Sequence, residues 1–274
     1  MLCFPNAKIN LGLNIIEKRE DGFHSIETVF CPVALSDVLE FIPEPALPPG
    51  TCIFDSTGIS IDGPDERNLC VRAYHLLNDQ FNLPAVQIHL HKIIPPGAGL
   101  GGGSSDAAFM LKYLDLQFGL KLGEEKLCAF ASQLGSDCAF FIKNRPMFGF
   151  DRGNQFRELS FFPQNLHMVI VNPGIHISTA EAYAGTTPHK PAQPLEELIR
   201  LPVDHWKNQI INDFEPAMIS RYPVIGEIRD RLYDLGAVYA SMSGSGSSVY
   251  GLFNEKAPAM SNQFPDFFCW PGPV

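Results

Sequence analysis

Apolar and polar residues alternate strictly over positions 8–15. A period of two is the pattern of a β-strand that buries one face in the core. Glu20-Asp21-Gly22 then gives a turn signal and an apolar run resumes, so residues 7–31 are predicted to form a hairpin. Lys8 and Asn10 lie on the polar face of the first strand, and we expect both to project into one cleft.

Helical spacing of apolar residues marks the next part of the chain. Asn68 precedes such a stripe and is predicted to cap the helix that follows. Pro223 is predicted to begin a helix that ends at Gly236 and leads into a strand, a Gly/Ser turn and a second strand over residues 237–253. Alternating and helical spacing of apolar residues also predict the remaining elements. These are strands near 51–61, 86–94 and 145–171 and helices over 107–118, 127–134 and 195–200. Helices and strands do not alternate regularly, which favours an α+β fold.

A glycine-rich loop separates the strand at 86–94 from the next helix. It places five glycines within residues 97–103. Glycine allows positive φ angles and lets a ligand approach the backbone closely. The first N–H groups of a helix lack intrahelical acceptors, and the helix dipole also favours an anion at that end. The loop is therefore predicted to bind phosphate rather than to act as a flexible linker.

Two other kinds of phosphate loop fit this segment less well. The loop contains Gly97-x-Gly99-x-x-Gly102, which a dinucleotide-binding βαβ unit also uses. Such a unit needs an acidic residue about twenty positions later at the end of a strand, whereas Glu124 and Glu125 begin a predicted helix. A Walker A loop would close with Gly-Lys-Ser or Gly-Lys-Thr, which is missing here.

Composition narrows the possible partners. The net charge is −10 and Lys and Arg form no run, which argues against nucleic acid or an anionic membrane as the main partner. Seven cysteines are scattered without a C-x-x-C spacing, a pattern of reduced thiols in the cytoplasm. Neither a leader peptide nor an apolar run of ~18 residues is apparent. The length suggests two domains, which we expect at 1–155 and 156–274.

Several segments together resemble one enzyme family. The loop is similar to the ATP loop of the galactokinase, homoserine kinase, mevalonate kinase and phosphomevalonate kinase (GHMP) superfamily. The match extends in order over residues 5–253. Its other segments are Ala7–Leu11, Asp21-Gly22-Phe23-His24, Gly135–Phe141 and the turn Met242–Ser247. The resemblance implies a ribosomal-protein-S5-like N-terminal domain, a ferredoxin-like C-terminal domain and a kinase that uses ATP with Mg²⁺.

Within the superfamily these segments resemble the branch that phosphorylates the tertiary 2-hydroxyl of a small cytidyl diphosphate acceptor on the non-mevalonate route to isoprenoid precursors. The resemblance implies that Lys8 and Asp137 are catalytic, Lys8 stabilising charge and Asp137 accepting the hydroxyl proton. Asn10 would contact the substrate. The ATP-binding residues would be Pro95, Pro96, Gly97, Ala98, Gly99, Leu100, Gly101, Gly102, Gly103, Ser104 and Ser105.

The same resemblance assigns the base-binding residues. His24 would read the cytosine ring by hydrogen bonding, and Phe23 and Tyr183 would stack on its two faces. The protein itself provides no evident metal site, and Mg²⁺ is expected only as the partner of ATP, near Ser104 or Ser105.

Simpler interpretations stay open for most of these residues. Lys8 could be an exposed strand lysine, His24 a turn histidine, and Asp137 the N-cap of the short helix after it. Ser105 and Asp106 could be helix N-caps, and for Asp106 we favour this. His89 and His91 alternate on a strand, where a solvated face is favoured over metal chelation.

Alternative functions are also left open. They are a homoserine or mevalonate kinase, a non-catalytic nucleotide-binding regulator on the same fold, and an oxidoreductase that binds a dinucleotide.

Overall fold

The computed structural model describes residues 1–159, 162–163, 165–257, 260 and 262–273. The chain forms two compact units that are interleaved along the sequence. Unit 1 comprises residues 1–7, 35–96 and 101–145, and unit 2 comprises residues 8–34, 97–100 and 146–274. The predicted division into domains 1–155 and 156–274 stays a prediction. Within the described residues, no helix is both long and apolar enough to cross a membrane.

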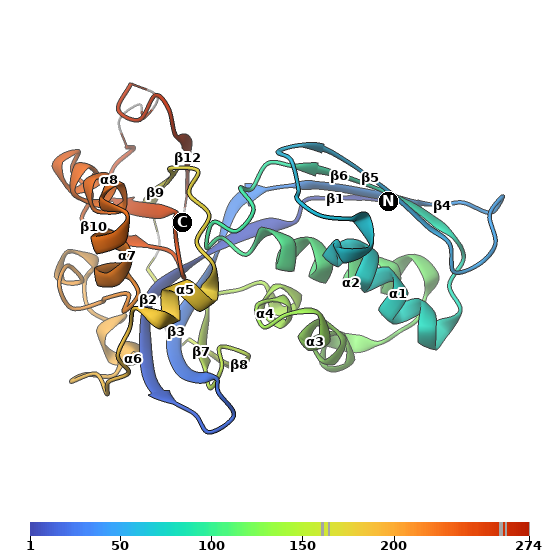
Figure 1. The fold of residues 1–274 in the computed structure, drawn as a ribbon, viewed down its shortest axis with the longest axis horizontal. Helices are drawn as coiled ribbons and strands as arrows, with labels where there is room; N and C mark the ends of the chain where they lie inside the picture. The colour runs from blue at the N-terminus through green and yellow to red at the C-terminus, as the bar shows by residue number, and fades with distance from the viewer. Residues whose placement is uncertain (160–161, 164, 258–259, 261, 274) are drawn as a thin grey trace. The chain divides into compact units, whose positions relative to one another are not determined.

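Unit 1 is a four-stranded sheet with helices on one face (Figure 1). The strand order is β1-β4-β6-β5, with β5 parallel to β6 and the other pairs antiparallel. Its strands are β1 (Leu2–Cys3), β4 (Val38–Pro43), β5 (Cys52–Gly58) and β6 (Val86–Lys92). Its helices are η1 (Asp65–Arg67), α1 (Leu69–Phe81), α2 (Gly102–Phe118), α3 (Gly123–Leu134) and α4 (Cys138–Lys143).

Local sequence signals explain how these elements begin and which face they bury. The Asn68 side chain accepts a hydrogen bond from Cys70 N at 2.9 Å, so the predicted cap of α1 is confirmed. In β6, Val86, Ile88 and Leu90 are buried. His89 and His91 lie on the opposite face, where both rings contact Thr57 Oγ1 at 3.1 and 2.9 Å. The described part of the chain holds no group of three or more side chains suited to bind a metal.

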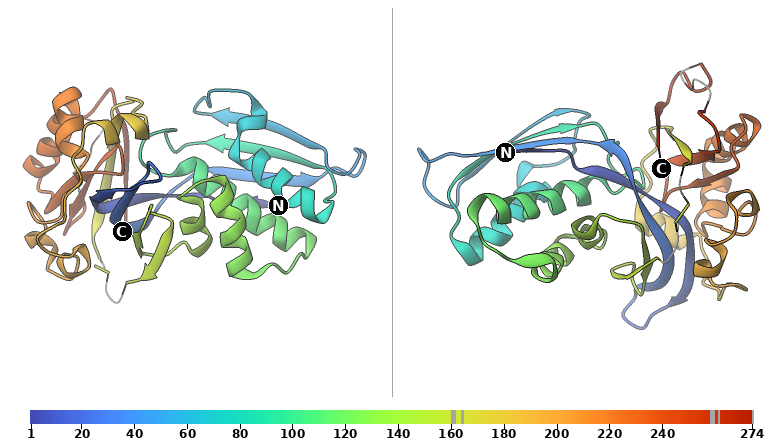
Figure 2. Two further views of the ribbon diagram at one scale, coloured as in Figure 1. Left: turned by 60° about the horizontal axis from the view of Figure 1, so that its bottom comes forward. Right: turned by 180° about the vertical axis from the view of Figure 1, so that it is seen from behind.

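Unit 2 contains two four-stranded sheets, ordered β2-β3-β7-β8 and β10-β11-β9-β12 (Figures 1 and 2). The first contains β2 (Asn6–Lys18), β3 (His24–Ser36), β7 (Met147–Phe150) and β8 (Gln155–Glu158). The second contains β9 (His167–Asn172), β10 (Tyr239–Met242), β11 (Val249–Phe253) and β12 (Phe268–Pro273). The helices of unit 2 are α5 (Thr179–Ala184), α6 (Leu195–Leu198), η2 (Val203–His205), α7 (Glu215–Arg221) and α8 (Pro223–Asp234).

The sequence patterns predict most of unit 2 correctly. β2 and β3 form the predicted hairpin, and α8 begins at Pro223 and leads into β10, a turn and β11. The apolar face of α8 (Ile225, Ile228 and Leu232) packs in one core with residues of β9, β10 and β11. The mixture of helices and strands confirms the α+β class.

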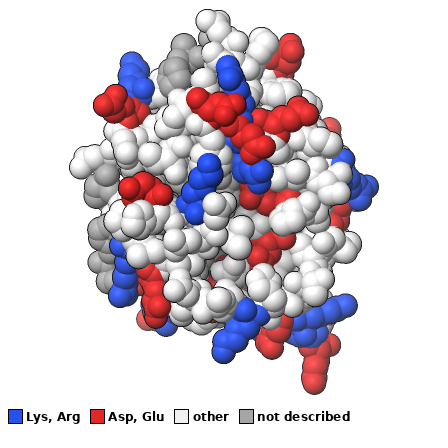
Figure 3. Space-filling model, turned by 90° about the vertical axis from the view of Figure 1, so that its left-hand side faces the viewer, with Lys and Arg blue, Asp and Glu red and all other residues white. Residues whose placement is uncertain are grey.

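Acidic and basic side chains are mixed on one face of the molecule (Figure 3). On the face drawn in Figure 3, Lys and Arg are scattered among Asp and Glu and do not form a single basic patch. On this face, single residues rather than a cluster carry the positive charge.

Candidate active site

The glycine loop joins the end of β6 to the start of α2. Gly97, Gly99 and Gly101 have φ angles of +64°, +76° and +70°, which only glycine adopts easily. A Cβ on Gly99 would lie 2.0 Å from Ser243 O, so the close approach of two backbones also requires glycine. Gly101 occupies the N-cap of α2 and offers no capping side chain. The first N–H groups of α2 therefore suit an anion.

Unit 2 brings Lys8 and Asn10 together with the loop. Lys8 is only 4% exposed, and its Nζ donates to Asn10 Oδ1 at 2.5 Å and to Gly99 O at 3.0 Å. Asn10 is 3% exposed and donates through Nδ2 to Thr28 Oγ1 at 3.0 Å. The interpretation of Lys8 as an exposed strand lysine is wrong. The alternation in β2 marks two buried faces, one apolar and one hydrogen-bonded.

The turn between β10 and β11 completes this cluster. Ser243 Oγ donates to Gly99 O at 2.9 Å and accepts from Asn10 N at 3.2 Å. A Cβ on Gly244 would lie 3.2 Å from Asn10 Oδ1 and 3.5 Å from Lys8 Nζ. The resemblance singled out this turn as a motif, but sequence reasoning gave none of its residues a role.

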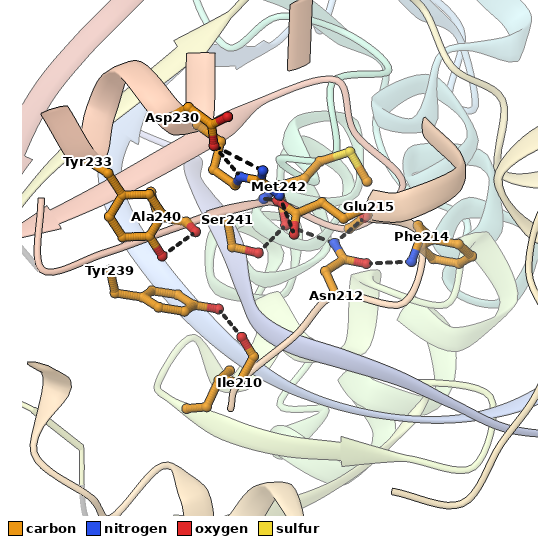
Figure 4. Close-up of polar contacts among 12 residues, drawn as sticks. Ile210, Asn212, Phe214, Glu215, Asp230, Tyr233, Tyr239, Ala240, Ser241 and Met242 are labelled. Carbon is orange, nitrogen blue, oxygen red and sulfur yellow. Dashed lines mark hydrogen bonds and ion pairs between the residues drawn. The ribbon is translucent and has the colours of Figure 1, made fainter. Parts of the chain in front are cut away.

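Sequence reasoning missed two residues that hold this turn (Figure 4). Asn212 Nδ2 donates to Met242 O and to Gly244 O, both at 2.8 Å, and Asn212 Oδ1 accepts from Phe214 N. Glu215 Oε1 accepts from Met242 N at 3.0 Å. Burial raises the pKa of the Glu215 carboxyl, and the positive charge of Arg229 opposes that rise. The sequence signal that could have indicated these two residues is their position, because Asn212 and Glu215 lie on either side of Asp213-Phe214 and just before Pro216.

Asp137 occupies the N-cap position of α4 in unit 1. Its backbone is right-handed helical and its side chain makes no capping hydrogen bond. The Asp137 side chain therefore does not act as a helix cap. Its carboxylate is partly exposed. Asp137 belongs to unit 1 and Lys8 to unit 2, and the pairing of the two in catalysis stays a prediction.

The prediction that Asp106 is a helix N-cap is wrong. Asp106 is the fifth residue of α2 and is buried, with Oδ2 accepting from Lys92 Nζ at 2.8 Å. Lys92 Nζ also donates to Asp37 Oδ2 at 2.5 Å. Ser105 is the fourth residue of α2, and its buried Oγ has no hydrogen-bond partner in the described structure. Gly101 takes the cap instead, because the turn into α2 requires a positive φ.

The Asp106 carboxyl has an unusual protonation equilibrium. Burial raises its pKa from about 3.8 to about 7, while the Lys92 ammonium opposes the rise. For Lys92, burial opposes the charged form, but the two carboxylates of Asp106 and Asp37 outweigh it and raise the ammonium pKa.

The predicted base-binding residues lie in unit 2. His24 stacks on Tyr183, with ring centroids 4.4 Å apart and an interplanar angle of 11°. Phe23 is 55% exposed, and the Arg152 guanidinium lies 4.8 Å from its ring centroid. The structure therefore brings His24 and Tyr183 together and leaves the Phe23 ring accessible on the hairpin turn.

The remaining loop residues are divided between the units. Ala98 and Leu100 in unit 2 are buried, and their carbonyl groups accept from Ser248 N at 3.2 Å and Lys8 N at 2.9 Å. The other predicted ATP-binding residues belong to unit 1 and are Pro95, Pro96, Gly102, Gly103 and Ser104.

Comparison with known proteins agrees with this fold and loop. The family model for the GHMP kinases N-terminal domain matches residues 68–145, and that for the GHMP kinases C-terminal domain matches residues 192–268. The structure of a Methanococcus jannaschii mevalonate kinase aligns with a TM-score of 0.66 at 16% identity, over 99% of this chain and 97% of that one, which shows a common fold. The matches to both family models define the chain as a GHMP kinase.

More similar relatives specify the family. A Parabacteroides distasonis protein is 49% identical over 99% of both chains, and a Bacteroides thetaiotaomicron protein is 50% identical over 99% of both. Both are 4-diphosphocytidyl-2-C-methyl-D-erythritol kinases. A crystal structure of such a kinase aligns with a TM-score of 0.82 at 30% identity, over 99% of this chain and 98% of that one. The chain belongs to the 4-diphosphocytidyl-2-C-methyl-D-erythritol kinase family.

Proposed function

We propose that this kinase transfers the γ-phosphoryl group of ATP to the 2-hydroxyl of 4-diphosphocytidyl-2-C-methyl-D-erythritol, giving ADP and the 2-phosphate. Near-full-length identity of 49–50% to kinases of that name carries the proposal. The reaction would be a step of the non-mevalonate isoprenoid pathway. We place it in the cytoplasm, because all seven cysteines are free thiols, as in a reducing compartment.

The glycine loop is the proposed ATP site. Three glycines with positive φ and the uncapped start of α2 offer backbone donors without intervening side chains. Mg²⁺ would bind mainly to phosphate and water oxygens, with the hydroxyl groups of Ser104 or Ser105 nearby. The unpartnered Oγ of Ser105 is compatible with such a role.

Phosphoryl transfer depends mainly on positioning and on stabilising charge. Lys8 carries an ammonium group that two acceptors hold in one place, which suits it to stabilise the charge of the transferring group. Asp137 is the proposed general base that removes the proton of the attacking hydroxyl. Lys8 would favour the ionised form of that carboxylate.

Three residues would select the cytidyl acceptor. Tyr183 offers an aromatic face that His24 covers in this structure, and Phe23 offers a second face on the hairpin turn. Stacking of both rings on cytosine, with a hydrogen bond from His24, would distinguish this acceptor from ones without a base. Asn10 would contact the acceptor beside Lys8.

The test is ADP release with ATP and Mg²⁺ in the presence of the cytidyl acceptor, homoserine or mevalonate, each supplied separately. We expect turnover with the cytidyl acceptor alone. Turnover with homoserine or mevalonate would support kinase activity but reject the base-binding roles of Phe23, His24 and Tyr183. Tight ATP binding without any turnover would favour a regulator.

A further inference from the structure

We propose that Asn212 and Glu215 are positioning residues that set the place of Lys8 and Asn10 through the turn at Met242–Gly244. Neither residue is assigned to contact a substrate. The inference rests on the proposed function, because it takes Lys8 to act in phosphoryl transfer.

The first step is the hold on the turn. Asn212 is fully buried and donates to the two carbonyl groups on either side of Ser243. Its own amide is oriented by Phe214 N, which donates to Asn212 Oδ1 at 3.0 Å. Glu215 accepts from Met242 N on the strand side. The N–H and C=O groups of Met242 and the C=O group of Gly244 are thus fixed by two side chains that are three residues apart. Figure 4 shows Asn212 and Glu215 beside Met242.

The second step is the anchoring of Asn212 itself. Residues 211–213 run beside β2, the strand that carries Lys8 and Asn10. Leu13 N donates to Ile211 O at 2.9 Å, and Asp213 N donates to Leu13 O at 2.8 Å. Asp213 Oδ2 accepts from Ile15 N at 2.7 Å. The support is therefore attached to the same strand as the residues that it positions.

The third step leads from the turn to Lys8. Ser243 Oγ and Lys8 Nζ donate to the same acceptor, Gly99 O. Ser243 Oγ also accepts from Asn10 N, and Asn10 Oδ1 accepts from Lys8 Nζ. A displacement of Ser243 would therefore disturb Gly99 O and Asn10 Oδ1, two groups that accept from the Lys8 ammonium. Misplacing a reacting group by about 1 Å costs about 10²-fold in rate.

Activity of paired variants tests this chain of contacts. Asn212→Asp keeps the shape but places a carboxylate oxygen against carbonyl oxygens. We expect kcat per folded molecule to fall at least about 10-fold. Tyr233→Phe is the matched control, because Tyr233 OH donates to Ala240 O on the same strand without touching the turn. Its kcat should stay within about 2-fold.

Two comparisons separate positioning from general destabilisation. Glu215→Gln keeps an acceptor oxygen and should recover most of the kcat that Glu215→Ala loses. Asn212→Asp combined with Ser243→Ala should be no slower than the slower single variant, because both act through one contact. Additive losses in the double variant would overturn the proposal. If Asn212→Asp does not fold, the two Glu215 variants provide the decisive comparison.

A measurement independent of turnover keeps the inference distinct from the proposed function. Acylation of lysine amines, read by mass spectrometry, reports how firmly Lys8 is held, with exposed Lys126 as the internal reference. We expect Lys8 labelling to rise at least about 3-fold in Asn212→Asp and to stay unchanged in Tyr233→Phe. Unchanged labelling in Asn212→Asp would overturn the proposal. A wild-type protein inactive on the cytidyl acceptor would contradict only the proposed function.

Discussion

Lys92 and Asp106 form a buried ion pair across the two ends of the glycine loop. Lys92 is the last residue of β6, Asp106 lies in the second turn of α2, and Lys92 Nζ is 2.8 Å from Asp106 Oδ2. Asp37 extends the pair. Its Oδ2 accepts from Lys92 Nζ, and its Oδ1 accepts from Ile93 N and Ile94 N at the start of the loop. The pair therefore ties the strand before the loop to the helix after it.

The Asp106 carboxyl of this pair gives folding stability a defined dependence on pH. Burial raises the pKa of Asp106 to about 7, whereas an unfolded aspartate titrates near 3.9. Between these values the folded state retains a proton that the unfolded state releases. The free energy of unfolding therefore falls as the pH rises from about 4 to about 7. Asp106→Asn removes this contribution.

Urea unfolding of the wild type and of Asp106→Asn at pH 5 and pH 7.5 measures the effect. We expect the wild type to lose more stability than Asp106→Asn over this interval. Asp79→Asn, which changes an exposed carboxylate on α1, should follow the wild type. Parallel pH dependences for the wild type and Asp106→Asn would contradict the assignment of the raised pKa.

The close approach of Gly99 to Ser243 predicts that a side chain at position 99 lowers stability by a steric clash in addition to backbone strain. Gly99→Ala introduces a Cβ at a φ of +76° and only 2.0 Å from Ser243 O. Gly174 has the same φ of +76°, but a Cβ added there would have nothing within 4 Å. Gly174→Ala should therefore cost about 1 kcal/mol of stability, from backbone strain alone.

We expect Gly99→Ala to lose clearly more stability than Gly174→Ala and to raise the KM for ATP at least about 10-fold, since the loop must shift. Thermal unfolding and ATP titration measure the two effects. Equal losses of stability in both variants would show that the loop accommodates the extra methyl group.

Sequence patterns predicted the elements more reliably than the contacts between them. The hairpin, the Asn68 cap and the helix beginning at Pro223 follow from local signals, and the structure confirms each. Asp106 was assigned wrongly because its partner, Lys92, lies fourteen residues away on a strand. Asn212 was missed because its acceptors lie thirty and thirty-two residues later. Contacts of this length depend on tertiary structure and leave no periodic signal.

The role of Asp137 predicts a selective loss of turnover. Asp137→Asn keeps the shape of the side chain and removes the proposed base. A general base contributes about 10²–10⁴-fold, so kcat should fall at least about 100-fold while ATP affinity changes little. Asp79→Asn is the control for a change of one acidic residue in the same unit. Turnover near the wild-type rate in Asp137→Asn would reject the assignment.

The stacked pair of His24 and Tyr183 predicts a loss confined to one substrate. Tyr183→Ala removes an aromatic face, and an aromatic pair contributes about 0.5–1.5 kcal/mol beyond the area it buries. We expect the KM for the cytidyl acceptor to rise about 10-fold, with the KM for ATP unchanged. Tyr183→Phe preserves the ring and should retain most of the affinity. Steady-state kinetics with each substrate varied in turn distinguishes the two effects. An equal rise in both KM values would mean that Tyr183 supports the fold of unit 2 rather than the base-binding face.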